Sequence, residues 1–141
     1  MTRGVVQLFA SCVLVFAINP TTVWAQDSGT PPAQTSVQTW LALIDTRSYA
    51  ASWETAATSF KKVVPRETWS ATVEEVRVQL GSLKTRVLKS ATPEQPPKPL
   101  QGEYIVFRFD TTFDRGPALI EVVSALKEND GTWRVAGYLV K

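Results

Sequence analysis

The chain has 141 residues, of which 15 are Lys or Arg and 13 are Asp or Glu, for a formal net charge of +2. It contains no histidine and one cysteine, so a Ser-His-Asp triad and any histidine-based zinc site are excluded. Basic and acidic residues are interspersed rather than clustered, which argues against nucleic acid as a partner.

The first 25 residues have the three parts of a secretory signal peptide. Arg3 supplies the positive charge, residues 8–18 (LFASCVLVFAI) are apolar and uncharged, and residues 23–25 (VWA) fit a cleavage site. We expect cleavage before Gln26 and an exported protein that is periplasmic or secreted.

Two alternatives compete with this interpretation. A retained membrane anchor needs about 20 apolar residues to cross the hydrocarbon core, and residues 5–18 are too few. A lipoprotein signal would use Cys12 as its lipidated residue, which leaves only a short apolar stretch before it. Cleavage before Gln26 removes Arg3 and the only cysteine, leaving 14 basic and 13 acidic residues and no thiol. We expect no membrane span in the mature protein.

Residues 26–35 (QDSGTPPAQT) are polar and contain two prolines and a glycine, a composition typical of a flexible linker. We place a single domain at residues 36–141. In its first half the apolar residues recur at helical spacing, which predicts helices. These are a short helix around Trp40–Ile44, one with an apolar stripe from Tyr49 to Val64, and one from Pro65 to Leu80 that Gly81 ends.

After Gly81 the apolar residues alternate with a period of two, which predicts strands. The expected strands cover residues 85–90, 103–113, 119–127 and 132–140. In the last of them, Trp133, Val135 and Leu139 are expected on one face. The proline-rich residues 92–99 are expected to form a loop between strands. Helices followed by a meander predict an α+β fold. Its N-terminal helices pack on one face of a curved antiparallel β-meander of about four strands, cone-like in shape.

Five segments of the sequence resemble a known family. They are WLALIDTRSYAASWETAATSF (40–60), PRETW (65–69), LGSLKTR (80–86), GEYIVFRF (102–109) and DGTWRVAGY (130–138). Together they resemble the bacterial exported family named domain of unknown function 4019, over about residues 37–141. No activity is attached to that family, so no functional residue is carried over. The order of elements is also similar to the cone-shaped nuclear transport factor 2-like fold, an analogy that implies no function.

Four residues are candidates for facing a ligand: Trp40, Asp45, Arg86 and Tyr138. Trp40 and Tyr138 lie near element ends, although aromatic residues are more often part of a core. Asp45 could be a carboxylate base in the mouth of the cone or could cap the helix that begins at Tyr49. Arg86 follows the switch from helix to strand, where it could clamp an anion or form a surface ion pair.

Other charged residues have plainer interpretations. Glu121 interrupts an apolar strand and would need a partner or a raised pKa if its side chain pointed inward. We expect it instead on a solvated face of the sheet. Arg66, Arg77 and Arg108 could likewise clamp an anion, but they are expected to pair on the surface with Glu67, Glu74, Glu75, Glu103 or Glu121.

These features favour a non-enzymatic binding or accessory domain in the bacterial envelope. Its partner would be an envelope protein, a peptide or a small ligand, bound on the concave side of the sheet. The alternative is a small-pocket enzyme of the nuclear transport factor 2-like type, with Asp45 or Glu121 as base and a tyrosine as donor. An enclosed pocket above about 300 Å³ holding a buried carboxylate would favour the enzyme, and a filled interior would oppose it. We expect no cofactor and no metal site.

Overall fold

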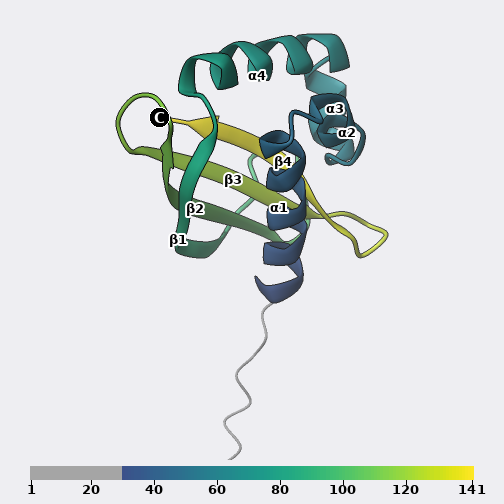
Figure 1. Ribbon diagram of the computed structural model, residues 1–141. Helices are drawn as coiled ribbons and strands as arrows, with labels where there is room; N and C mark the ends of the chain where they lie inside the picture. The colour runs from purple at the N-terminus through teal and green to yellow at the C-terminus, as the bar shows by residue number, and fades with distance from the viewer. Residues whose placement is uncertain (1–29) are drawn as a thin grey trace, which may run out of the picture.

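The computed structural model describes residues 30–141, so the expected signal peptide lies outside the described residues. Four helices come first and a four-stranded sheet follows, which confirms the α+β class (Figure 1). The helices are α1 (Thr30–Asp45), α2 (Tyr49–Glu54), α3 (Thr58–Val63) and α4 (Arg66–Leu80). The strands are β1 (Leu83–Glu94), β2 (Tyr104–Phe113), β3 (Leu119–Lys127) and β4 (Trp133–Val140).

The sheet is a simple meander in the order β1-β2-β3-β4, and every neighbouring pair is antiparallel. Helix α1 lies across one face of the sheet, and α4 runs along its top (Figure 1). The core fills the space between the helices and the sheet because each element turns its apolar side inward. Fully or almost fully buried members include Val37, Leu41 and Ile44 of α1, Phe107 and Phe109 of β2, and Val123 of β3.

Helix α1 begins at Thr30 rather than near Ser36. Residues 30–35, which we expected in the flexible linker, are therefore helical, and that part of the prediction is wrong. The two prolines at 31 and 32 fall in the first turn, where proline needs no helical hydrogen bond. Ala33 is fully buried against the core, so packing of this first turn outweighs the linker-like composition.

The single helix expected from Tyr49 to Val64 is divided into α2 and α3. The chain leaves the helix at residues 55–57, where Ala56 and Ala57 are fully buried. The Ala57 N–H donates a 2.8 Å hydrogen bond to the carbonyl oxygen of Val135 on β4. The break satisfies a backbone group on the edge strand, a long-range contact that helical spacing alone does not reveal.

A β-bulge decides which side chains of β4 face the core. The register with β3 shifts between Ser124 and Ala125, which leaves one extra residue on β4. Before the bulge, Trp133 and Val135 are buried. Beyond it the alternation is inverted, so Tyr138 packs against the core while Leu139 is 53% exposed. The expectation that Leu139 shares a face with Trp133 is therefore wrong.

Residues 30–141 contain no helix that is both long and apolar enough to cross a bilayer. The same residues contain no group of three or more acidic side chains placed to hold a metal ion.

Candidate functional site

A buried network of ion pairs joins the helices to the concave face of the sheet. Asp45 ends α1, while Arg77 comes from α4, Arg86 from β1 and Glu121 from β3. Arg77 Nη2 donates to Asp45 Oδ1 at 2.8 Å, and Arg86 Nη1 donates to Asp45 Oδ2 at 2.7 Å. Arg86 Nε donates to Glu121 Oε2 at 2.6 Å. Two guanidinium groups and two carboxylates thus alternate, and the network carries no net formal charge.

Glu121 is fully buried, and other groups occupy both of its carboxylate oxygens. Oε1 accepts from the Tyr138 hydroxyl at 2.6 Å and from Arg86 Nη2 at 3.2 Å. Oε2 accepts from the Thr111 hydroxyl at 2.7 Å and from Arg86 Nε at 2.6 Å. A carboxylate has about four acceptor positions, so none is left for a substrate. The expectation that Glu121 lies on a solvated face is wrong, because its strand faces the core at that position.

Asp45 does not cap helix α2. The N-cap of α2 is Ser48, and no side chain makes a capping hydrogen bond there. The Asp45 carboxylate is instead held by Arg77 and Arg86, with 21% of the side chain exposed. The capping interpretation is therefore wrong. The ion pairs take precedence because Asp45 supplies a counter-charge to two arginine side chains that lie largely inside the fold.

Arg77 was expected on the surface, but its side chain is only 5% exposed. The buried residues of α4 are spaced four apart and end on this arginine, whereas Val76, the residue before it, is 39% exposed. The Arg77 guanidinium lies 4.6 Å from the centroid of the Phe113 ring, a cation–π contact. Its Nη2 binds Asp45, but its buried Nη1 has no hydrogen-bond partner among the described residues.

The two other arginines form surface ion pairs as expected, but with glutamates other than those named from the sequence. Arg66 pairs with Glu54 at 3.3 Å and Arg108 with Glu94 at 3.3 Å, with all four side chains well exposed. Of these four arginines, Arg77 and Arg86 belong to the buried network.

The network fixes the protonation of two of its members. For Arg86, burial alone would lower the pKa, but hydrogen bonds to Asp45 and Glu121 outweigh it and raise the pKa above its usual range. For Tyr138, burial and then the charge of Glu121 raise the pKa well above its ordinary value. Arg86 therefore stays cationic, and the Tyr138 hydroxyl stays protonated as a donor.

The aromatic residues form a cluster beside the network. The Trp40 ring centroid lies 5.4 Å from that of Tyr138 and 5.8 Å from that of Trp69. Trp40 is only 3% exposed, and its indole N–H donates to the Ser52 carbonyl at 2.8 Å. The four residues singled out from the sequence, Trp40, Asp45, Arg86 and Tyr138, are thus connected through Glu121. That they face a ligand stays a prediction.

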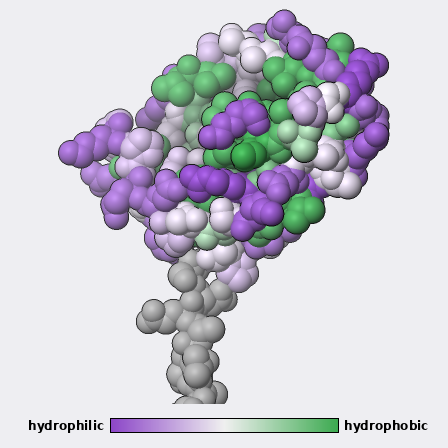
Figure 2. Space-filling model, turned by 90° about the vertical axis from the view of Figure 1, so that its left-hand side faces the viewer, coloured by the Kyte–Doolittle hydropathy of each residue, from purple (hydrophilic) through white to green (hydrophobic). Residues whose placement is uncertain are grey.

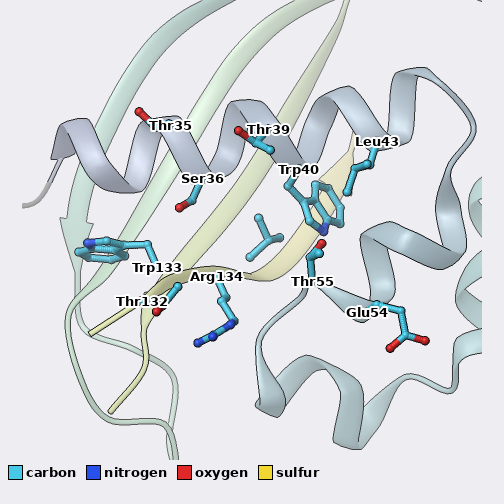
Figure 3. A pocket seen from close by; sticks show the side chains of 11 residues that line it. Thr35, Ser36, Thr39, Trp40, Leu43, Glu54, Thr55, Thr132, Trp133 and Arg134 are labelled. Atoms are coloured by element: carbon cyan, nitrogen blue, oxygen red, sulfur yellow. The ribbon is translucent and has the colours of Figure 1, made fainter. Parts of the chain in front are cut away.

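An open groove of about 500 Å³ lies between α1 and the start of β4. Figure 3 shows Trp133 and Trp40 at opposite ends of the groove, with Ser36 reaching toward it from α1 and Thr55 from the segment after α2. Its lining is mainly aromatic and hydroxyl-bearing, and neither Asp45 nor Glu121 belongs to it.

Both charged residues of the groove are already paired. Arg134 donates to Glu128 at 2.7 Å and to Asp130 at 2.8 Å, and Glu54 pairs with Arg66 at 3.3 Å. The groove therefore offers hydroxyl groups and aromatic surface rather than a free charge.

Residues 36–138 match the family model described as Protein of unknown function (DUF4019). The chain belongs to this family. The match covers most of the chain and confirms the resemblance drawn from its sequence. A comparison with curated proteins gave no significant match. The fold is similar to a 2.5 Å structure from Catenulispora acidiphila, with a TM-score of 0.55 and 12% identity. That alignment covers 84% of this chain and 94% of the other, and at such low identity it shows the fold alone.

Part of the buried network in this DUF4019 domain is not predicted by the sequence pattern. Thr111 and Arg77 were not among the candidates, and Glu121 was placed on the wrong side of the sheet. A signal was present for Glu121, because a carboxylate within an apolar strand requires either solvent or a buried cation. For Arg77, the signal was its position four residues after Val73, itself four after Trp69, on the stripe that faces the core.

Proposed function

We propose that this DUF4019 chain is exported and that its mature domain binds a component of the envelope without catalysing a reaction. The observation that carries the proposal is the filled interior of the cone, where Arg86, Thr111 and Tyr138 occupy every acceptor position of Glu121. A general base needs a free lone pair within reach of the substrate proton, and Glu121 has neither the lone pair nor the access.

Asp45 is no better placed to act as a base. Three guanidinium N–H groups point at its two oxygens at 2.7–3.0 Å. These three donors occupy most of the about four acceptor positions of the carboxylate. Tyr138 is not placed to donate to a substrate either, because its hydroxyl donates a hydrogen bond to Glu121.

The binding site in this proposal is the groove between α1 and β4. Clefts that bind ligands are largely apolar or aromatic with a few polar groups that set orientation, which describes this lining. Since Arg134 and Glu54 already have partners of opposite charge, a charged ligand would have to compete with those partners. We therefore expect an uncharged polar ligand, either a small molecule or a peptide segment of an envelope protein.

Crosslinking in living cells tests the binding site. A photo-reactive residue at Thr39, which lines the groove, is compared with one at Val63, which is 76% exposed on α3 and outside it. A dominant adduct from Thr39 that is absent from Val63 is expected for a macromolecular partner. For a small ligand, native mass spectrometry of the exported protein should show added mass that Ser36→Trp abolishes and Val63→Trp retains. Equal adducts at both positions, or added mass that survives Ser36→Trp, would contradict the proposal.

The export step has its own test. The intact mass of the protein recovered from the periplasm or culture medium should correspond to a chain that begins at Gln26. Recovery of the full chain, still beginning at Met1 and in the membrane fraction, would favour the retained anchor. A mass consistent with lipid on Cys12 would favour the lipoprotein alternative.

A further inference from the structure

A second hollow, separate from the groove, lies between α4 and the end of β4 and has a volume of about 230 Å³. Val76 and Leu139 line it and are 39% and 53% exposed, so apolar side chains reach the surface at this place. Figure 2 views the molecule from the side on which the C-terminus lies and shows apolar surface gathered between hydrophilic patches.

The hollow combines apolar walls with a buried cation. Trp69 and Val73 of α4 contribute to the walls, Arg77 is its charged member, and Thr72 and Tyr138 carry its hydroxyl groups. Arg77 is 5% exposed, and its Nη1 has no partner among the described residues. An unpaired donor in a buried position is costly, and an acceptor supplied by a ligand would remove that cost.

The positive charge of Arg77 is also less fully neutralised by nearby carboxylates than that of Arg86. Arg86 is held by both carboxylates of the network, whereas Arg77 shares Asp45 with it and has no second carboxylate partner among residues 30–141. Tyr138 and Thr72, the other polar residues of the lining, are neutral, and the Tyr138 hydroxyl keeps its proton and donates a hydrogen bond to Glu121. Arg77 is the one charged residue of the lining, so the hollow favours an anionic ligand although the network as a whole is neutral.

We propose that this hollow binds a small monocarboxylate with an apolar body. The carboxylate accepts a hydrogen bond from Arg77 Nη1, and the body packs between Val73 and Leu139. Pockets for drug-sized ligands start at about 300 Å³, so a hollow below that size suits a short chain or a single ring. Nη1 is covered in the free protein, and ligand entry therefore includes rotation of a half-exposed wall residue such as Leu139.

Titration of the mature protein with hexanoate tests the proposal, with tryptophan fluorescence as the readout because Trp69 lines the hollow. Acetate supplies the carboxylate without the body, and 1-hexanol the body without the charge. A charge-assisted hydrogen bond is expected to make hexanoate bind about tenfold more tightly than 1-hexanol. Acetate should not saturate over the same range. Equal affinity for hexanoate and 1-hexanol, or no saturable binding of hexanoate, would overturn the proposal.

Variants on α4 locate the binding event. Thr72 lies on the exposed rim of the hollow, so Thr72→Trp should block hexanoate without touching the ion pairs. Val78 is 52% exposed on the same helix and outside the hollow, so Val78→Trp is the matched control and should bind as the parent does. Arg77→Met should lose the preference for hexanoate over 1-hexanol. If that variant fails to fold, Thr72→Trp still decides, because hexanoate binding that survives it rules this site out.

Discussion

Arg86 forms a bidentate ion pair with Asp45, in which Nη1 donates to Oδ2 at 2.7 Å and Nη2 donates to Oδ1 at 3.0 Å. The pair connects the last residue of α1 to the first strand of the sheet, and the same guanidinium group also donates a hydrogen bond to Glu121 on β3. One side chain thus connects the helical layer with two strands. Bidentate pairing also fixes the relative orientation of these elements, because the planar guanidinium permits little rotation.

Replacing Arg86 by Met should destabilise the domain by about 3–5 kcal/mol, since Glu121 would then be buried without a cation. Urea unfolding followed by tryptophan fluorescence measures the change. Arg108→Met is the matched control, because Arg108 forms an exposed ion pair with Glu94 and should cost about 0–1 kcal/mol. Equal destabilisation by the two variants would mean that the buried network contributes no more than a surface pair.

Ser52 should be important for stability although it carries no charge. Its carbonyl accepts the Trp40 indole N–H at 2.8 Å, and its hydroxyl accepts the Trp69 indole N–H at 2.9 Å. Ser52→Ala leaves the buried Trp69 donor unpaired, which should cost about 1–3 kcal/mol in urea unfolding. Thr55→Ala, in the segment after the same helix, should cost less, because its hydroxyl bonds only to nearby carbonyls of α2. The reverse order would contradict this assignment.

Gly102 and Gly131 form a matched pair for testing a close backbone approach. Both have positive φ, +114° and +79°, so alanine at either site should cost about 1 kcal/mol from backbone strain. A Cβ at Gly102 would in addition lie 2.8 Å from the Lys127 carbonyl oxygen, whereas at Gly131 it would meet nothing within 4 Å. Gly102→Ala should therefore lower the unfolding midpoint in urea clearly more than Gly131→Ala, and similar midpoints would refute the contact.

The fold class and the order of elements could be predicted from the sequence because periodicity reports which side of an element is apolar. The burial of Glu121 and Arg77 could not be predicted from the sequence. A charged side chain is stable in the core only beside a partner on a distant segment, and the spacing along one element does not identify that partner. The exposure of Leu139 depends on a bulge that inverts the alternation within β4. Asp45 and Arg86 were identified as residues of interest, but their contact with each other was not, because it joins elements 41 residues apart.

Tyr138 should make stability fall at high pH. Its pKa is raised above the ordinary value of about 10, by burial first and then by the charge of Glu121, so the folded state holds its proton more tightly than the unfolded chain. The stabilisation is therefore complete below about pH 10 and is lost as the pH rises further, with a slope of about 1.4 kcal/mol per pH unit for one proton.

Tyr49 also has a raised pKa, from burial first, so the measurement of the Tyr138 effect must be a difference between variants. The free energy of unfolding of the parent minus that of Tyr138→Phe should be constant from pH 7 to 9 and shrink above about pH 10. A difference that stays constant up to about pH 12 would show that the Tyr138 hydroxyl titrates normally and is not committed to Glu121.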